Sequence, residues 1–354
     1  MTESFSGGTE EREEIKKTCR VCKRRVYGQY KKSGGRRCVV CLHRTHRDHL
    51  AGNRRSCQLC AKEDLTIHEE YRQVPNIITL VHLTDLHFGA NDSPKRTELL
   101  KEWIGSRGEQ YILISGDLTR MARREEYDKA ALWIHEVEST GAKVAVVPGN
   151  HDISYWENAS SLMGQVLGRK YQSWTKKIDR PIEPCLRGPG CVILGLNSAH
   201  GLNPARLLNG YLDRHQRARA IEILKATPKE HVKIVFCHHP MVRFADNRHR
   251  DMFRSGMVRG ELISAGANLF LWGHQHSFAS VMLTGSGRDC YAIQGPTLSD
   301  RTGEGGMPGF LMVQWIYNQR VTIQSYDIVE DQYIEENQTI EYPLKEEDFG
   351  SLLN

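Results

Sequence analysis

The stretch IITLVHLTDLHFG, residues 77–89, begins as a short apolar run, IITLVHL (77–83), and ends in side chains that can bind metal. An apolar run of four to eight residues rich in β-branched side chains is typical of a buried strand. Asp85 and His87 follow this run directly. The stretch therefore predicts a buried strand with two potential metal ligands at its carboxyl end.

Five further apolar runs follow along the chain, and longer segments with helical periodicity separate them. Two such segments are 124–139 and 214–225. Toward the C-terminus, four more runs follow one another with only loops between them. This order predicts an α/β fold with a mixed sheet system and helices outside. The runs are YILIS (111–115), KVAVV (143–147), CVILGL (191–196), KIVFC (233–237) and NLFLW (268–272), and the late ones cover 279–284, 289–293, 308–316 and 320–328.

Polar segments suited to metal binding follow five of the first six runs. Ligands of open α/β sheets bind beyond the carboxyl ends of the strands, so these segments are expected to converge. Imidazole, carboxylate and amide groups together suit a pair of divalent cations such as Mn, Fe or Zn. Two such ions clamp a phosphoryl group and activate a water molecule. The segments are Asp85-x-His87, Gly116-Asp117, Gly149-Asn150-His151-Asp152, His238-His239-Pro240 and Gly273-His274-Gln275-His276.

In this order and strand context, the five segments resemble the motifs of the calcineurin-like metallophosphoesterases. Any one of them alone is typical of an ordinary surface loop, whereas all five in order are specific. The resemblance covers about residues 77–330 and implies a four-layer αββα fold, a mixed β-sandwich flanked by helices. The sequences of the motifs are most similar to those of the branch that contains class III cyclic-nucleotide phosphodiesterases. They are HLTDLHFG (82–89), ISGDLT (114–119), VPGNHD (147–152), HHP (238–240) and WGHQH (272–276).

The resemblance also implies roles for individual side chains. His151 would be the catalytic histidine that protonates the leaving oxygen, and Asp152 would lie behind it and orient its ring. His200, His239 and Arg243 are further candidates for contact with substrate. The implied metal ligands are Asp85, His87 and His276 for the first ion, Asn150, His238 and His274 for the second, and Asp117 as the bridge between them.

Residues 16–62 differ sharply in composition from the rest of the chain. They hold 15 Lys and Arg and a single acid, whereas the whole chain has a net charge of only +5. Six of the ten cysteines lie here in three C-x2-C pairs. Such pairs in a chain without a secretory signal favour zinc over disulfides, and a segment this short needs metal to fold. The charge density suits the phosphate backbone of DNA or RNA.

Two groupings of the zinc ligands are open, with one or two structural zinc ions. Cys19, Cys22, Cys38 and Cys41 have the spacing of a four-thiolate site, with fifteen residues between the two pairs. A second ion held by Cys57, Cys60 and two histidines also fits. A single ribbon and an interleaved two-zinc arrangement accommodate the spacing equally. The predicted structural ligands are Cys19, Cys22, Cys38, Cys41, Cys57, Cys60, His46 and His49.

Composition divides the chain into five segments and predicts its location. No apolar run is long enough to span a bilayer, so we expect a cytoplasmic protein that does not bind membranes. Nothing in the sequence determines the oligomeric state. The segments are a disordered acidic tail (1–14), a basic zinc-binding module (15–62), a linker (63–76), a metallophosphoesterase domain (77–340) and a C-terminal tail (341–354).

Three functions are compatible with these features. The first is a two-metal phosphoesterase that hydrolyses a phosphodiester by metal-activated hydroxide and is directed to nucleic acid by the basic zinc module. The second is a hydrolase of a cyclic nucleotide or other small phosphodiester, whose zinc module docks a protein partner. The third is a non-catalytic nucleic-acid-binding protein. The first is favoured because no implied metal ligand is missing and the basic charge suits a phosphate backbone.

Overall fold

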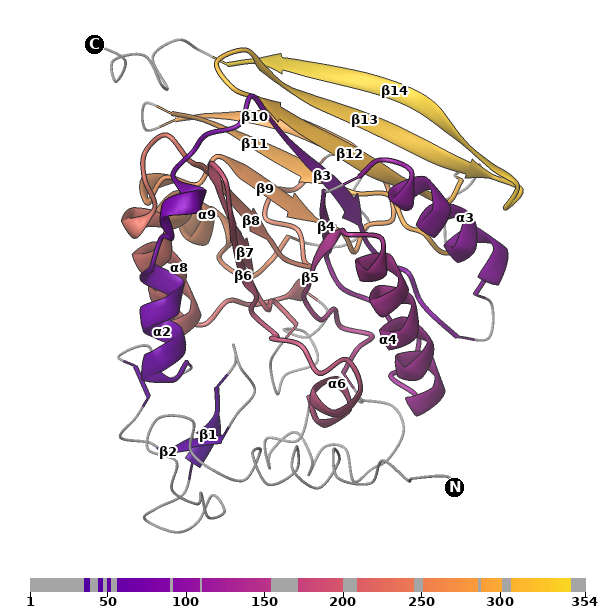
Figure 1. Ribbon diagram of the computed structural model, residues 1–354, viewed down its shortest axis with the longest axis horizontal. Helices are drawn as coiled ribbons and strands as arrows, with labels where there is room; N and C mark the ends of the chain where they lie inside the picture. Colours follow the sequence, from indigo (N-terminus) through magenta and orange to yellow (C-terminus); the bar gives the residue numbers. More distant parts are fainter. Residues whose placement is uncertain are drawn as a thin grey trace, which may run out of the picture.

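Two six-stranded sheets form the centre of the molecule (Figure 1). The computed structural model describes residues 35–38, 44–46, 50–51, 56–89, 92–108, 110–153, 171–199, 209–244, 251–285, 288–300 and 307–344. The first sheet contains β3 (Ile77–Leu83), β4 (Tyr111–Ile114), β5 (Lys143–Val146), β12 (Gly309–Ile316), β13 (Arg320–Val329) and β14 (Tyr333–Pro343), in the order β14-β13-β12-β3-β4-β5. The second contains β6 (Cys185–Gly188), β7 (Cys191–Gly195), β8 (Val232–Phe236), β9 (Leu269–Trp272), β10 (Ala279–Gly285) and β11 (Arg288–Gln294), in the order β10-β11-β9-β8-β7-β6.

Each sheet combines a parallel centre with antiparallel strands. In the first sheet β3, β4 and β5 are parallel, while β12, β13 and β14 pair antiparallel. In the second sheet β7, β8, β9 and β11 are parallel, and the edge strands β6 and β10 pair antiparallel. The carboxyl ends of the parallel strands therefore supply ligand-binding loops from both sheets.

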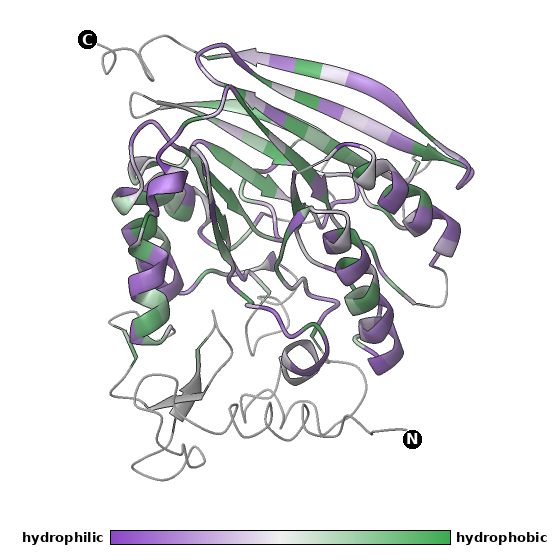
Figure 2. Cartoon of the chain, in the orientation of Figure 1, coloured by the Kyte–Doolittle hydropathy of each residue, from purple (hydrophilic) through white to green (hydrophobic). Residues whose placement is uncertain are grey.

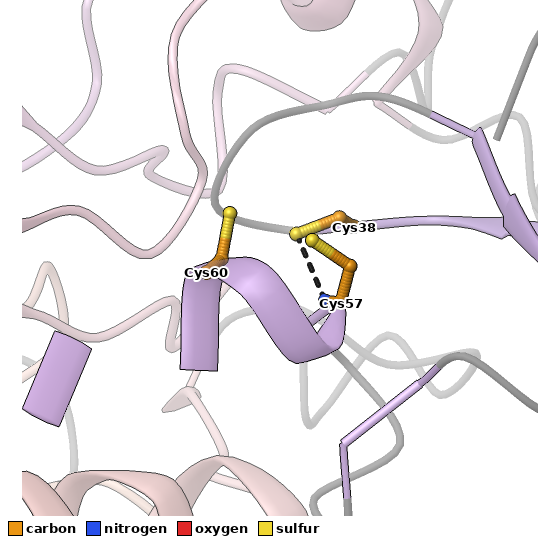
Figure 3. A group of neighbouring side chains, drawn as sticks. All are labelled: Cys38, Cys57 and Cys60. Carbon is orange, nitrogen blue, oxygen red and sulfur yellow. Dashed lines mark hydrogen bonds between the residues drawn. The ribbon is translucent and has the colours of Figure 1, made fainter. Parts of the chain in front are cut away.

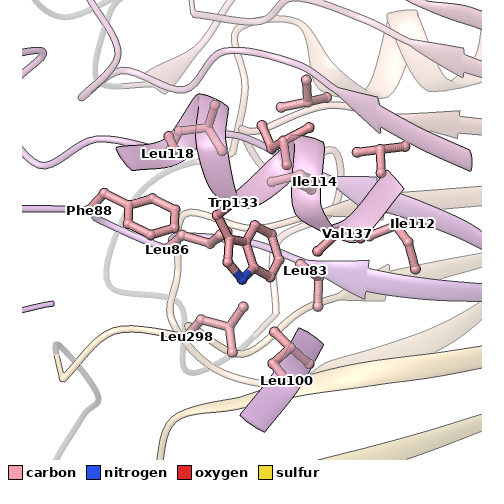
Figure 4. Close-up of a cluster of buried hydrophobic side chains, with 14 of the residues drawn as sticks. Leu83, Leu86, Phe88, Leu100, Ile112, Ile114, Leu118, Trp133, Val137 and Leu298 are labelled. Carbon is pink, nitrogen blue, oxygen red and sulfur yellow. The ribbon is translucent and has the colours of Figure 1, made fainter. Parts of the chain in front are cut away.

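Helices cover the outer face of each sheet. The helices of the first sheet are α3 (Pro94–Gly105), α4 (Arg124–Ser139) and α6 (Gln172–Lys177), and those of the second are α8 (Arg214–Ala226) and α9 (Ser255–Ser264). One buried cluster lies between the sheets, a second under α3 and α4 (Figure 4), and a third under α8 and α9. This four-layer arrangement confirms the predicted fold class.

Most predicted elements agree with the structure to within one residue, but several described elements were missed, among them β6, β14, α3, α6 and α9. β3 and α4 have the predicted bounds. β6 was missed because its sequence, CLRG, has no apolar run, and β14 because it is an exposed, largely hydrophilic edge strand (Figure 2). α3 and α9 were not predicted either, although Ser93 caps α3 and Pro94 begins it, which is a recognisable start signal. No helix of the described residues is long and apolar enough to cross a membrane.

The N-terminal segment contributes a short hairpin and one helix to the described residues. The hairpin pairs β1 (Gly35–Arg37) with β2 (Arg44–His46). Helix α2 (Gln58–Leu65) crosses the boundary predicted at residue 62, and the 3-10 helix η2 (Glu69–Tyr71) lies inside the predicted linker. Tyr71 and Asn76 accept backbone hydrogen bonds from Gly190 and Tyr317 of the sheets. The predicted linker is thus hydrogen-bonded to the sandwich.

A buried histidine makes the fold sensitive to acid. His82 in β3 is fully buried, and its Nε2 lies 2.8 Å from Ser115 Oγ. Burial lowers its pKa from 6.5 to about 3, although Asp85 opposes the shift. Between these values the unfolded chain binds a proton that the folded chain excludes, so stability falls as the pH drops through this window.

Replacing this histidine should remove part of the acid sensitivity. Between pH 7.5 and pH 5.5, His82 should account for a loss of about 1.4 kcal/mol in the free energy of unfolding, since the unfolded pKa lies one unit above the lower pH. Urea denaturation at both pH values should show a smaller decrease for His82→Gln than for the wild type. His135→Gln, at an exposed position of α4, is the control and should leave the decrease unchanged. Equal decreases in wild type and His82→Gln would contradict the assignment.

Candidate metal centre

Loops from both sheets bring the predicted metal ligands to one place. Three of these loops follow β3, β4 and β5, and two follow β8 and β9. The histidine and aspartate ligand atoms form overlapping groups of three, and the atoms of each group lie within 4.8 Å of one another. The chain therefore converges at this edge as its strand order predicts.

One group of ligand atoms surrounds Asp85. Its Oδ1 lies 3.2 Å from His276 Nε2 and 3.9 Å from His87 Nε2. Its Oδ2 accepts hydrogen bonds from Thr84 Oγ1 at 2.5 Å and from the His274 backbone N–H at 2.9 Å. Burial alone would raise the pKa of Asp85, but His276, His238 and His87 outweigh it and hold it well below its usual range. Asp85 is therefore a carboxylate anchored through one oxygen and facing two imidazoles with the other.

A second group surrounds His238. Its Nδ1 donates a hydrogen bond to the Ser115 carbonyl at 2.8 Å, and this bond assigns the proton to Nδ1. Nε2 lies 3.0 Å from Asn150 Oδ1 and 3.1 Å from His274 Nδ1. In the neutral ring Nε2 is a lone-pair atom, and it faces the amide oxygen of Asn150. A cation between these atoms would satisfy them together.

Asp117 lies between the two groups. Its Oδ2 is 3.4 Å from His238 Nε2 and 3.9 Å from His87 Nε2, while its Oδ1 accepts the His151 backbone N–H at 2.9 Å. Burial would raise the pKa of Asp117, but His238, His151 and His87 together lower it. The structure thus places one ionised carboxylate in contact with both sets of imidazoles.

His87 provides the clearest test of whether cations fit here. It is only 4% exposed, and neither ring nitrogen has a hydrogen-bond partner among the described residues. Burial lowers the pKa of His87 to about 4, so the ring is neutral near pH 7. A buried imidazole without hydrogen bonds is costly unless a ligand satisfies it. The buried neutral ring, next to two carboxylates, fits a divalent cation.

The side chain of Asp152 is bonded to two loops of the site. Its carboxylate accepts hydrogen bonds from Gly149 N, Leu118 N, Thr119 N and Thr119 Oγ1, at 2.8–3.1 Å, and none of these comes from His151. In the described structure the His151 ring is instead oriented by the carbonyl of Arg120, which accepts from Nδ1 at 2.7 Å. A role for Asp152 in orienting this ring therefore stays a prediction.

Asp152 instead holds the loops after β4 and β5 together. Its hydrogen bonds join Gly149, at the start of one loop, to the two residues that follow Asp117 in the other. Burial and the charge of Asp117 raise the pKa of Asp152 to about 6, against these hydrogen bonds. Through these hydrogen bonds the carboxylate helps to fix the position of Asp117 relative to Asn150.

Five of the seven predicted ligands have a left-handed backbone conformation, which non-glycine residues rarely adopt. Each such residue costs about 1 kcal/mol, and this strain persists only where the surroundings impose it. Strain concentrated in the ligands themselves is characteristic of a functional site. The φ angles are 54° for Asp85, 49° for His87, 51° for Asp117, 72° for His274 and 60° for His276.

Gly273 allows the loop after β9 to approach the loop after β3. A Cβ on this residue would overlap Thr84 Oγ1 and lie 2.5 Å from Asp85 Oδ2. Gly273→Ala should therefore displace Asp85 and lower kcat/KM toward a phosphoester about 10–100-fold, as expected when the support of a metal ligand is removed. Gly260→Ala in α9 is the control, because nothing lies within 4 Å of its added Cβ. Equal activity of the two variants would show that the contact is dispensable.

The other predicted site residues are not all placed at this centre. His239 is fully buried, and Ser198 Oγ lies 2.8 Å from its Nδ1. Arg243 is exposed in the loop after Pro240. His200, Cys19, Cys22, Cys41 and His49 lie outside the described residues, and only the backbone of His46 is described, in β2. Cys38, Cys57 and Cys60 lie together, away from the metal centre.

Several supporting residues were missed by sequence reasoning. Thr84 and Ser115 bond to Asp85 and His238, and Thr297, after β11, donates to the Asp85 carbonyl at 2.9 Å. Thr84 and Ser115 lie next to the ligand motifs in the sequence, and this position could have indicated their role. Thr297 has no such signal, because its contact spans 212 residues of sequence.

Comparison with known protein families gives a match to the segment that contains the five motifs. The family described as "Calcineurin-like phosphoesterase" matches residues 78–278. A comparison with curated protein sequences gave no match to the chain.

Solved structures align with most of this chain at low sequence identity. A purple acid phosphatase from seeds of yellow lupin (Lupinus luteus) aligns with 79% of this chain at 9% identity and a TM-score of 0.53. The alignment spans only 56% of the lupin protein, so the likeness concerns the fold alone. The anchor protein of the Plasmodium inner membrane complex covers 77% of this chain and 90% of its own length, at 10% identity and a TM-score of 0.47. A predicted phosphoesterase of Streptococcus pneumoniae covers 76% and 99%, at 13% identity and a TM-score of 0.38.

Proposed function

Since the chain belongs to the calcineurin-like phosphoesterase family, and is thus a metal-dependent phosphoester hydrolase, we propose that its substrate is a phosphodiester of nucleic acid. The observation that carries the chemistry is the position of Asp117 between the imidazoles of His87 and His238. A bridging carboxylate between two imidazole sets is the arrangement that holds paired divalent cations.

The proposed ligands divide as the family motifs imply. Two cations (Mn, Fe or Zn) would supply positive charge to the phosphoryl oxygens and lower the pKa of a water molecule. Asp85, His87 and His276 would hold one ion, and Asn150, His238 and His274 the other, with Asp117 shared. Thr84, Ser115 and Thr297 fix the orientation of these ligands through the hydrogen bonds described above.

His151 is the proposed catalytic acid. Its Nδ1 donates a hydrogen bond to the Arg120 carbonyl, so the proton passed to the substrate would come from Nε2. Its ring lies 4.8 Å from the ring of His87, centroid to centroid, and its side chain is only half-buried. Delivery of a proton from Nε2 to the leaving oxygen would complete cleavage of the phosphoester bond.

The basic N-terminal segment favours a nucleic acid as the substrate. Residues 16–62 hold 15 cationic side chains and one acid, which is the charge pattern that binds phosphate backbones. A small phosphodiester would need no such surface. The motif sequences, which are similar to those of class III cyclic-nucleotide phosphodiesterases, support an alternative. In that alternative the substrate is a small phosphodiester, and the basic segment docks a protein partner.

A substrate panel with added manganese decides between these functions. Single strands, duplexes, cyclic nucleotides, phosphomonoesters and a chromogenic phosphodiester would be compared at several salt concentrations. We expect the highest kcat/KM with a nucleic acid and a steep decrease in its affinity with salt. Preference for cyclic nucleotides, without salt dependence, would support the alternative.

Charge-removing variants of the full chain test the basic segment directly. Lys31→Gln combined with Lys32→Gln should weaken nucleic-acid binding and reduce the slope of log affinity against log salt by about one for each phosphate that is no longer neutralised. Hydrolysis of the chromogenic phosphodiester should be unchanged. An unchanged slope would argue against the nucleic-acid assignment while leaving the hydrolase assignment intact.

A further inference from the structure

Three cysteine sulfurs meet at the start of helix α2 (Figure 3). The Sγ atoms of Cys38, Cys57 and Cys60 lie within 4.8 Å of one another, and each residue is at most 1% exposed. Cys38 directly follows β1, while Cys57 precedes α2 and Cys60 lies in its first turn. The cluster therefore joins the β1–β2 hairpin to α2.

Hydrogen bonding and proximity in this cluster both favour a bound cation. The Cys57 backbone N–H donates a hydrogen bond to Cys38 Sγ at 3.3 Å, an interaction that favours negative charge on sulfur. Three sulfurs at one point cannot all be joined in disulfides with one another. Three buried thiolates would repel each other unless a cation lay between them. A shared metal ion would account for the hydrogen bond to sulfur, for three cysteines at one point and for the stability of their charges.

We propose that Cys38, Cys57 and Cys60 are ligands of a single structural zinc ion. In a tetrahedral site with Zn–S bonds of about 2.3 Å, the sulfurs lie about 3.8 Å apart, within the separation found here. Thiolate ligands favour zinc over harder cations such as Mg²⁺ and Mn²⁺.

The proposed ion would attach the N-terminal hairpin to the phosphoesterase domain through α2. At the other end of this helix, Asp64 Oδ2 accepts from Arg219 Nε of α8 at 2.9 Å. Arg187 of β6 donates to the Asp64 carbonyl through Nε at 3.1 Å and also through Nη2. Because α2 is held at both ends, the zinc site would fix the orientation of the basic segment relative to the domain.

Coupled release of metal and thiols tests the proposal in the wild-type full-length protein. Chelation should release zinc, and mass spectrometry after alkylation should show Cys38, Cys57 and Cys60 becoming reactive together with loss of one zinc. Cys290 is the internal control, since it is fully buried in the core and should stay protected throughout. Alkylation of the three cysteines at separate stages, or without zinc release, would overturn the proposal.

Paired substitutions test whether the three residues share one ion. Cys38→Ser and Cys57→Ser should each lose one zinc per chain, and the double variant should lose only that same zinc. Cobalt substitution should show thiolate-to-metal absorption that decreases in both variants and is unchanged in Asp117→Asn, since the phosphoesterase centre contains no cysteine among its proposed ligands. Loss of two zinc ions in the double variant would assign Cys38 and Cys57 to different ions and overturn the grouping.

Discussion

Asp117→Asn should lower kcat/KM for a chromogenic phosphodiester, assayed with manganese, by about 10³-fold, which corresponds to about 4 kcal/mol. Asparagine preserves the size of the side chain and retains an oxygen that can accept the His151 backbone N–H. It removes the charge that lies 3.4 Å from His238 Nε2 and 3.9 Å from His87 Nε2. The loss should therefore reflect weaker binding of both cations rather than misfolding.

Metal content and a surface control make this result specific. Asp117→Asn should bind fewer divalent ions than the wild type while its circular dichroism spectrum and unfolding midpoint in the presence of chelator remain similar. Asp128→Asn, on the exposed side of α4, removes a carboxylate from a surface pair with Lys177 and should leave activity unchanged. If Asp117→Asn hydrolyses the substrate as fast as Asp128→Asn, the two-metal assignment is wrong.

Arg219→Met should decrease the free energy of unfolding by about 3–5 kcal/mol, because it leaves two buried carboxylates without their cation. The guanidinium, 2% exposed, lies 2.9 Å from Asp64 Oδ2 and 3.8 Å from Glu183 Oε2. Burial alone would lower the pKa of Arg219, but Asp64 and Glu183 raise it, so the ionised form is held in place. The variant should also release α2 from α8.

Urea denaturation and limited proteolysis measure these two effects. Arg217→Met on the same helix is the matched control, since Arg217 pairs with the partly exposed Glu261 at 3.4 Å and should cost less than about 1 kcal/mol. Cleavage of residues 56–76 should accelerate in Arg219→Met but not in Arg217→Met. Similar unfolding free energies for the two variants would show that the buried ion pair does not hold α2.

Elements with a strong periodic signal could be predicted from the sequence, and those without one could not. β3 was predicted to the residue because a strand buried between layers is mostly apolar, as IITLVHL is. β14 has alternating polar residues and an exposed surface, so its position depends on pairing with β13 rather than on its own composition. The contact of Asp64 with Arg219 could not be predicted either, because it spans 155 residues of sequence.

The ligand segments were recognisable in the sequence, but their geometry was not. Residue types and strand order indicated that five loops converge, and the structure places them together. The hydrogen bonds of Asp152 to the loop after β4 could not be predicted, because adjacency to His151 in sequence does not determine where its carboxylate points. The turn at residues 149–152 directs Asp152 toward the loop after β4 and leaves the His151 ring to the Arg120 carbonyl.

The sequence by itself determined the family, the α/β fold and the residue types of the metal centre, because these depend on local runs and on short motifs at strand ends. It did not determine which cysteines meet. Fifteen residues separate Cys22 from Cys38, and fifteen also separate Cys41 from Cys57, so spacing alone supports either grouping. Only the tertiary structure, by placing the end of β1 against the start of α2, brings Cys38 to Cys57 and Cys60. Contacts between distant segments depend on how the layers pack, and that information is not present in any single stretch of the chain.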